Sequence, residues 1–394
     1  MPEQTVQTRD MLINMGPSHP STHGVLRVVL ELDGEMVQRA IPHVGYLHRG
    51  YEKLGEDMTF HQYIPYTDRL DYLAPLANNT AYALAVEKLL GLEIPPRAKA
   101  IRVLISELAR ISSHLLGVGT WIMDVGALTV FFYTFQEREY LYDIFEMLTG
   151  ARLTTSFTRV GGLSFDLPPG FTERVGEFLD RFPSKIDETE NLVSQNRIWL
   201  DRTVGVGVIP KERAIALSLT GPNARASGVE WDLRKEMPYL GYEQYDFDVP
   251  IGKNGDCFDR YIVRLEEMRQ SVKICRQVLD TLPDGPIVAD APEIVLPPKQ
   301  QVYTKMEELI RHFKIISEGI KPPKGEIYSG VENPKGELGF YIVSDGGPHA
   351  YRMHIRSPSF ITIQSLEWVL PGHRIADVVC IIGSLDFVMG ECDR

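Results

Sequence analysis

The feature that most constrains the fold is a helical period that runs without interruption through residues 258–282. Its apolar residues recur at steps of three and four positions: Ile262, Leu265, Met268, Val272, Cys275, Leu279 and Leu282. That spacing puts them on one face of a helix, which is typical of a helix packed inside a bundle. We interpret Cys275, which lies on this face, as a core residue rather than a reactive thiol.

Partner helices are predicted between about residues 74 and 150. The first is alanine-rich and ends at Gly91, and the second is opened by Pro95 and Pro96, because proline is tolerated in a first helical turn. We expect the second helix to end near Gly117 and Gly119. A third runs from about Thr129 to Gly150.

Some charged residues of these helices are interpreted as lying off the apolar faces. Arg102 and Arg110 fall beside the face of the second helix. The runs Glu137-Arg138-Glu139 and Glu266-Glu267 are most simply solvated helix surfaces. Residues from about 171 to 199 are predicted to be helical, with an interruption at Pro183.

Strand patterns flank the helical region on both sides. They cover residues 11–14, 25–32, 36–41, 326–331, 336–343 and 351–356. Asp33-Gly34 is a hairpin signal, a linker-like stretch covers 286–298, and a helix is expected at about 302–318. We predict an α+β fold in which a central helical bundle is closed by small β-structures from both ends of the chain. The chain is treated as one unit, 1–394, with a β-rich part (1–73), a helical bundle (74–285) and a C-terminal α/β part (286–394).

Composition narrows the class of protein. The 394-residue chain carries 41 basic and 53 acidic residues, a net charge of −12, which argues against nucleic acid as a partner. No apolar run approaches the roughly 20 residues of a membrane span, and residues 1–10 are too polar for a secretory signal. The four cysteines form no C-x-x-C pair, so we expect no zinc or iron–sulfur site in this chain.

The loop Gly16-Pro-Ser-His-Pro-Ser-Thr-His-Gly24 is the first candidate for function. Two prolines and two glycines in nine residues give a loop of defined shape directly before a predicted strand. His19 and His23 are spaced as metal ligands can be, but no H-E-x-x-H motif or cysteine pair accompanies them. From these residues alone a surface turn is the simpler interpretation.

Two further candidates follow the loop. The segment Tyr66–Tyr72 holds two carboxylates, an arginine and two phenols, which an exposed, ion-paired segment before a helix also explains. Asp124 is a lone acid in an apolar context, where a carboxylate needs a cation or dense hydrogen bonding, or caps a helix end. These residues do not specify a reaction.

Longer motifs resemble a known family. Six motifs are similar to those of the D subunit, or 49 kDa subunit family, of proton-pumping NADH:quinone oxidoreductase (respiratory complex I). They are Gly16–Arg27, Gly45-Tyr-Leu-His-Arg-Gly50, Asp71-Tyr72, Asp124-Val-Gly-Ala127, Trp231-Asp-Leu-Arg-Lys235 and Gly390-Glu-Cys-Asp-Arg394. The likeness covers essentially the whole chain. It implies a fold like that of the [NiFe]-hydrogenase large subunit.

The hydrogenase itself is an alternative that fails on its ligands. Its large subunit holds nickel and iron through two cysteine pairs. By the resemblance, the first pair corresponds to Asp71 and Ala74 of this chain and the second pair to Val388 and Glu391. None of these is a cysteine, and Cys392 alone cannot replace four thiolates.

The resemblance implies a quinone site in place of the metals. His23 and Tyr72 match the residues that bracket the quinone headgroup, and Asp124 matches the acid that pairs with that histidine. A catalytic set of His23, Tyr72 and Asp124 follows, while Arg49 and Arg69 match arginines near the partner's iron–sulfur cluster. Where many members have a histidine near that cluster, this chain has Thr154.

The implied enzyme is NADH:quinone oxidoreductase, with quinone as substrate and proton translocation coupled to its reduction. The resemblance implies that this chain binds no cofactor of its own, and that a 4Fe-4S cluster lies in the neighbouring iron–sulfur subunit (the B subunit). The C and I subunits and the membrane subunits H and A are further implied partners, at the cytoplasmic side of the cell membrane as a peripheral protein. The alternatives are a non-catalytic hydrogenase-like scaffold or an energy-converting hydrogenase subunit.

Overall fold

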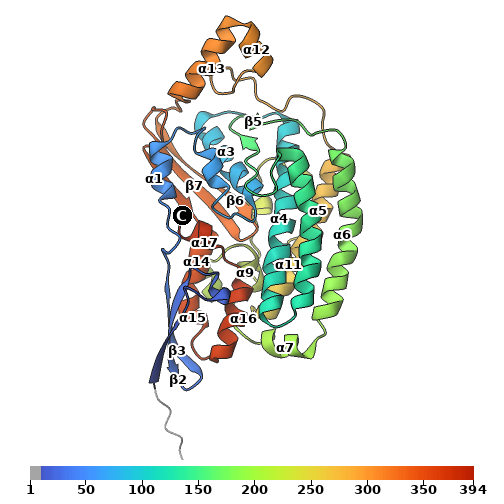
Figure 1. The fold of residues 1–394 in the computed structure, drawn as a ribbon, viewed down its shortest axis with the longest axis vertical. Helices are drawn as coiled ribbons and strands as arrows, with labels where there is room; N and C mark the ends of the chain where they lie inside the picture. The colour runs from blue at the N-terminus through green and yellow to red at the C-terminus, as the bar shows by residue number, and fades with distance from the viewer. Residues whose placement is uncertain (1–9) are drawn as a thin grey trace, which may run out of the picture.

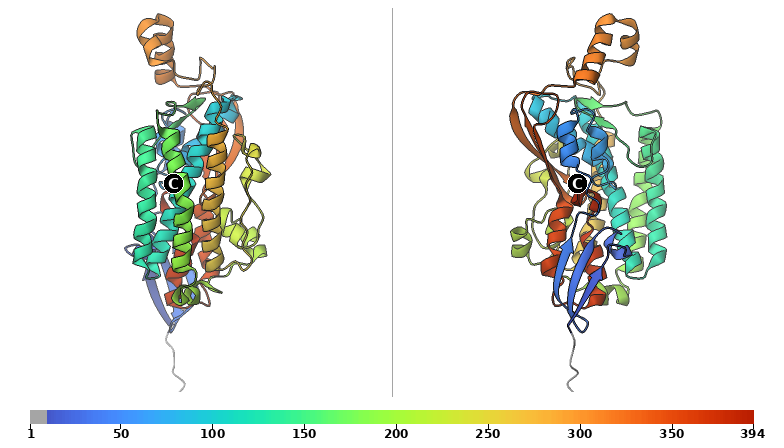
Figure 2. Two further views of the ribbon diagram at one scale, coloured as in Figure 1. Left: turned by 90° about the vertical axis from the view of Figure 1, so that its right-hand side faces the viewer. Right: turned by 60° about the vertical axis from the view of Figure 1, so that its left-hand side comes forward.

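Long helices form the body of the molecule in this computed structural model, which describes residues 10–394. The expectation about residues 1–10 falls almost wholly outside the described part of the chain. Figures 1 and 2 show the long helices standing side by side. They are α3 (Pro75–Leu90), α4 (Pro96–Asp124), α5 (Leu128–Thr149), α6 (Phe171–Val193) and α11 (Cys257–Asp280). The predicted bundle is thus confirmed, and Cys275 is fully buried in it.

Helix α4 corrects the prediction that Gly117 and Gly119 end it, since it continues to Asp124. Both glycines are sites of close approach. A Cβ on Gly117 would lie 2.5 Å from Oδ1 of Asp386, and one on Gly119 would lie 2.2 Å from Oγ1 of Thr134. The missing side chains therefore let α4 pack closely against α5 and against the residue that follows α16 (Ile375–Leu385).

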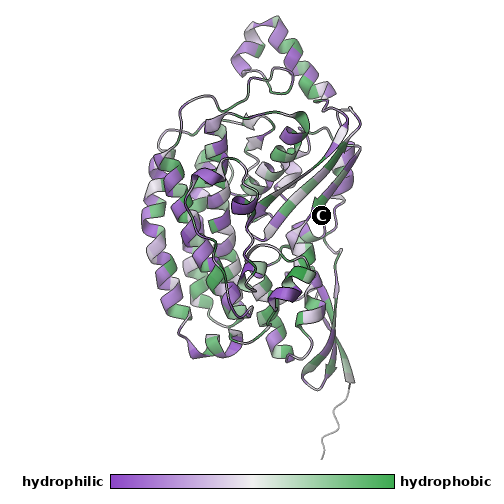
Figure 3. Cartoon of the chain, turned by 180° about the vertical axis from the view of Figure 1, so that it is seen from behind, coloured by the Kyte–Doolittle hydropathy of each residue, from purple (hydrophilic) through white to green (hydrophobic). Residues whose placement is uncertain are grey.

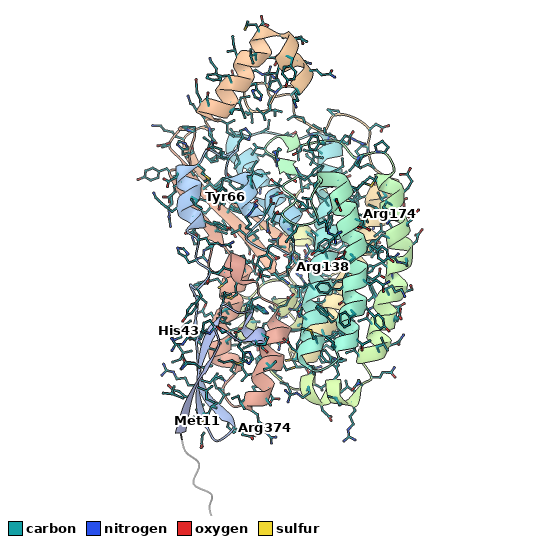
Figure 4. The ribbon with its side chains drawn as sticks, viewed as in Figure 1. Met11, His43, Tyr66, Arg138, Arg174 and Arg374 are labelled. Atoms are coloured by element: carbon teal, nitrogen blue, oxygen red, sulfur yellow. The ribbon has the colours of Figure 1, made fainter. Side chains whose placement is uncertain are left out.

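The interpretation of several charged residues as solvated was wrong. Glu137, Arg138 and Glu267 are buried, whereas Glu139 is exposed. Arg102 and Arg110, which were expected only beside the apolar face of α4, are buried as well. Each buried guanidinium has a polar partner, as burial of charge requires: Arg102 pairs with Glu87 at 2.6 Å and Arg110 with Glu107 at 3.2 Å. Figure 4 shows Arg138 in the middle of the molecule, in contrast to Arg174 on the outer helix α6.

Three small antiparallel sheets accompany the bundle. The first follows the order β1-β2-β3 and contains the predicted hairpin, and the second is a short hairpin, β4-β5. The third has the order β6-β7-β8 and packs on α3. Their bounds are β1 (Asp10–Met15), β2 (Arg27–Asp33), β3 (Met36–His43), β4 (Thr158–Arg159), β5 (Gly162–Leu163), β6 (Gly325–Asn333), β7 (Gly336–Ser344) and β8 (Arg352–Arg356). The mixed α+β class is confirmed, and one continuous core includes Leu30, Leu104 and Phe340 from its three parts.

Short helices connect these elements. They are η1 (Pro20–Thr22), α1 (Tyr51–Asp57), α2 (Ile64–Thr67), α7 (Arg197–Thr203), α8 (Lys211–Ala216), α9 (Gly221–Ala226), α10 (Leu233–Glu236), η2 (Tyr242–Gln244), α14 (Pro358–Gln364), α15 (Leu366–Val369) and α17 (Met389–Cys392). Helix α6 runs through Pro183 without the predicted break.

The helix expected at 302–318 is divided into α12 (Lys299–Thr304) and α13 (Met306–Glu318) by the extended backbone of Lys305. Helices α12 and α13 form an arm that stands clear of the body. Figure 3 shows apolar residues along this arm, and Met306 and Phe313 are exposed there. No helix within residues 10–394 is both long and apolar enough to cross a membrane.

Candidate functional site

The loop Gly16–Gly24 has the defined shape that its composition predicts. Gly16 adopts φ +85°, and a Cβ there would lie 2.1 Å from the carbonyl oxygen of Leu26. Nδ1 of His19 accepts a hydrogen bond from the Ser21 amide at 3.2 Å, and the His19 carbonyl accepts from the Thr22 hydroxyl at 2.9 Å. His19 is therefore part of the internal bonding of the loop.

His23 ends η1 in the left-handed conformation, at φ 55°. Its ring is exposed on one side and lies on Phe387 on the other, with the ring centroids 5.0 Å apart. Burial by the surrounding protein lowers the pKa of His23, while Asp386 raises it and Lys335 lowers it further. A neutral imidazole results, with one nitrogen as a donor and the other as an acceptor.

Two carboxylates act on the histidines of this loop. Asp124 is the last residue of α4 and is half-buried; burial raises its pKa, and the histidine that acts against this is His19. The carboxylate that acts on His23 is Asp386. The expected pairing of His23 with Asp124 stays a prediction, and the structure adds Asp386 as a carboxylate that acts on His23.

The segment Tyr66–Tyr72 is not the exposed, ion-paired segment that its composition allows, because Asp68 and Asp71 are both fully buried. Asp68 accepts a hydrogen bond from Asn79, and Asp71 accepts one from the Leu73 amide. Of the charged residues in the segment, only Arg69 has a substantially exposed side chain. The helix α3 that follows has little surface, so the turn before it is packed into the core.

Tyr72 is half-buried at the end of this turn. Its hydroxyl has no hydrogen-bond partner among residues 10–394, although it is not sealed off from solvent. Burial raises the pKa of Tyr72, Asp71 raises it further, and Arg49 opposes both. The phenol therefore stays protonated and is available as a donor.

Arg49 joins three segments that are distant in sequence. Its Nη2 donates to the carbonyl of Arg69 at 2.8 Å and to that of Gly390 at 2.7 Å. Gly390 in turn packs so closely on the turn that a Cβ would lie 2.5 Å from the Leu70 carbonyl oxygen. The structure thus brings Arg49 and Arg69 together beside Tyr72.

Thr154, at the position where the resemblance implies a histidine in many family members, lies in a strained segment. Its φ is +55° and its hydroxyl donates to the Leu153 carbonyl. The segment is joined to the Tyr72 turn, because the Phe157 amide donates to Asn79, which also donates to Asp68.

A cluster of buried charges lies behind Tyr72 and His23. Asp71 and Glu391 are fully buried, and each opposes the ionisation of the other: burial and the charge of Asp71 raise the pKa of Glu391 to about 8. Nζ of Lys335 lies 2.5 Å from Oδ2 of Asp386. The four positions that the resemblance sets against the hydrogenase cysteines are all buried. Within residues 10–394, no group of three or more histidine, cysteine or carboxylate side chains is arranged to hold a metal ion.

Comparison with known proteins identifies the family. Residues 124–394 match the model of the respiratory-chain NADH dehydrogenase 49 kDa subunit. The chain is 62% identical over 384 residues to the NADH-quinone oxidoreductase D subunit of Methylacidiphilum infernorum, covering 98% of this chain and 92% of the relative. It is 59% identical over 387 residues to the D subunit of Geotalea uraniireducens, covering 98% and 99%. The chain belongs to the D subunit family of NADH-quinone oxidoreductase.

For this member of the D subunit family, the motifs predicted the site only in part. Arg49 and Arg69 lie beside the Tyr72 turn, and His23 lies on Phe387 of the C-terminal segment that also packs on this turn. Lys335 was missed, because it lies in the turn between β6 and β7, where lysine normally reaches solvent. Asp386 was not among the predicted site residues, and the contact of Phe387 with His23 joins positions too distant for any local signal.

Proposed function

We propose that this chain forms the headgroup end of the quinone site in NADH-quinone oxidoreductase, where quinone is reduced to quinol. The main support is the pair formed by His23 and Tyr72. Each presents a polar group that the described protein leaves open, at the surface of a cluster of buried charges. A quinone carries a carbonyl acceptor at each end of its ring, and imidazole and phenol can both donate to such oxygens.

The chemistry follows from the charge states of the two groups. Reduction of a quinone adds two electrons and two protons, so negative charge develops at oxygens that need donors. The Tyr72 phenol is protonated at neutral pH and can donate directly. His23 is neutral, so it can take up a proton from the protein side and pass it to the oxygen as charge develops.

The electrons come from an iron–sulfur cluster in a neighbouring subunit. Arg69 has an exposed guanidinium beside the Tyr72 turn, and Arg49 stacks on Tyr51 with its Cζ 4.3 Å from the ring centroid. Positive charge here favours the reduced, more negative form of a cluster docked on this face. Asp124 is retained in the proposed set as a proton-exchanging group of the loop, through His19.

We further propose the assembly that the related D subunits imply. The chain docks on the iron–sulfur B subunit, with the C and I subunits and the membrane subunits H and A as neighbours, on the cytoplasmic side of the cell membrane. A fold like that of the hydrogenase large subunit accords with the burial of Asp71, Ala74, Val388 and Glu391 beneath the site. Proton translocation is coupled to quinone reduction in the assembled complex.

Replacement of Tyr72 by phenylalanine in the assembled complex tests the proposal. Because the variant removes only the donor hydroxyl, NADH:quinone turnover should fall about 10²-fold or more, the lower end of the range for a positioned proton donor. Electron transfer from NADH to ferricyanide should stay normal, which shows that the complex is assembled. Tyr351→Phe, which changes an exposed tyrosine, is the matched control. Normal quinone turnover in Tyr72→Phe would refute the assignment.

A further inference from the structure

Lys335 has an environment that is unusual for a lysine in a hairpin turn. It follows β6 and precedes β7, yet only 4% of its surface is exposed. Its ammonium group lies 2.5 Å from the Asp386 carboxylate, which is itself largely buried. A buried ammonium is tolerated only with a close counter-charge, so this pair must form for the hairpin to pack against the end of α16.

Asp386 is held from several sides. It ends α16 in the left-handed conformation, at φ 50°, and Nε of Arg264 on α11 lies 3.5 Å from its carboxylate. Gly117 of α4 leaves space for the carboxylate, since a Cβ there would lie 2.5 Å from it. The next residue, Phe387, carries the ring on which His23 packs. Any shift of Asp386 is therefore transmitted to His23 through one peptide unit.

The Lys335 charge acts on titratable groups of several segments around this point. It acts on His23 from the loop, on Asp71 from the Tyr72 turn, on His114 from α4, and on Asp386 and Glu391 from the C-terminal segment. Three buried polar atoms of the cluster have no hydrogen-bond partner among the described residues: Oδ2 of Asp71, Oε2 of Glu391 and Nε of Arg264. The two carboxylate oxygens give the cluster places at which protons can be exchanged.

We propose that Lys335 and Asp386 are the positioning residues of the quinone site, acting through His23, with the Lys335 ammonium as a fixed cation beneath it. The inference rests on the proposed function and deepens it. As electrons arrive, the ammonium offsets the negative charge that develops above it. Asp386 holds Phe387 and thus the His23 ring, and it sets how readily that ring takes up a proton.

The two charges act on His23 in opposite directions, which makes the proposal testable in the assembled complex. Lys335→Met removes a charge that lowers the pKa of His23 and leaves the opposing charge of Asp386 in place, so the pKa of His23 rises. Asp386→Asn leaves Lys335 and Arg264 unopposed, so the pKa of His23 falls. His23 takes up the proton that it passes to the quinone less readily as pH rises, so turnover falls on the alkaline side at a pH that the His23 pKa sets. The alkaline limb of the plot of turnover against pH should therefore move to higher pH in Lys335→Met and to lower pH in Asp386→Asn. Each shift should be on the order of one pH unit.

Matched variants separate this role from simple charge balance. Lys273→Met removes an exposed ammonium that pairs with Asp246 and should leave the profile unchanged. Lys335→Arg keeps the charge and should keep the position of the limb. The double variant Lys335→Met/Asp386→Asn restores neutrality, so it should assemble even where a single variant does not. Its limb should lie near that of the unmodified complex, while its quinone turnover stays at least about tenfold lower.

The results that overturn the proposal are distinct from those that overturn the proposed function. Shifts in the same direction, no shifts, or full turnover in the double variant would show that the pair only balances charge. Comparison of these variants with Tyr72→Phe shows which of the two proposals fails. Slow turnover in Tyr72→Phe with unchanged limbs in both single variants rejects the Lys335–Asp386 role alone, whereas normal turnover in Tyr72→Phe rejects the quinone assignment itself.

Discussion

At the scale of single residues, burial sets the charge state of the groups around Tyr72. Asp71 and Glu391 share one buried region, where two negative charges cannot easily coexist. The Ser359 hydroxyl and amide both donate to Oε1 of Glu391, which holds the carboxyl group in place. The cluster therefore retains a proton at neutral pH, immediately behind the Tyr72 turn.

This retained proton predicts a dependence of stability on pH. Burial, followed by the charge of Asp71, raises the pKa of Glu391 from 4.5 to about 8, so the folded chain binds this proton more tightly than the unfolded chain. The contribution to the free energy of unfolding is complete below the unfolded pKa and is lost as pH rises through about 8. Thermal inactivation of the assembled complex should show this decline, and Glu391→Gln should flatten it. Glu177→Gln, at an exposed position on α6, should leave the decline intact; an unchanged slope in Glu391→Gln would contradict the assignment.

Two helical glycines form a second residue-scale test. Gly117→Ala places a Cβ 2.5 Å from the Asp386 carboxylate, so we expect a loss of about 1–3 kcal/mol, typical of overpacking. Gly176→Ala on α6 meets no atom within 4 Å and should stabilise the helix by about 0.5–1 kcal/mol. Thermal denaturation of the complex that contains each variant measures the difference. Equal effects would show that Asp386 has room to move.

At the scale of elements, buried ion pairs join neighbouring helices and hairpins. Arg102 of α4 donates to Glu87 of α3 and to the carbonyls of Arg159 and Gly162 in the β4-β5 hairpin. Glu87 also accepts from the Gly161 amide at 2.7 Å. Two side chains thus hold three elements together through hydrogen bonds that apolar packing could not supply.

The buried pair of Arg102 and Glu87 predicts a large loss of stability from a small change of side chain. Glu87→Gln leaves the fully buried Arg102 without its counter-charge, so we expect a destabilisation of about 3–5 kcal/mol. Glu188→Gln breaks the exposed pair with Lys185 on α6 and should cost about 0–1 kcal/mol. The abundance of the chain in the complex and the thermal inactivation of the complex check both values. Similar losses for the two variants would mean that Arg102 finds another partner.

At the scale of the whole molecule, the two ends of the chain build the site together. The Asp393 carboxylate accepts hydrogen bonds from the amides of Gly45 at 2.9 Å and Leu47 at 2.7 Å, and Arg394 pairs with Glu52 of α1. Figure 1 shows the C terminus beside α1, above the β1-β2-β3 sheet. The bundle supports these segments, since the His23 loop packs on α16 and the turn that holds Tyr72 is bonded to α3.

The sequence by itself determined the elements and the family. The period of 258–282, the Asp33-Gly34 hairpin and the motifs around His23 and Tyr72 are local, because side-chain spacing along the chain dictates which faces are apolar. Only the tertiary structure decided which charges are buried and which groups meet. Lys335 and Asp386 are 51 positions apart, and Phe387 reaches His23 from the other end of the chain. Burial and Coulomb interactions depend on distances in space, so the burial of Lys335 beside Asp386 and the contact of Phe387 with His23 have no signature in the sequence.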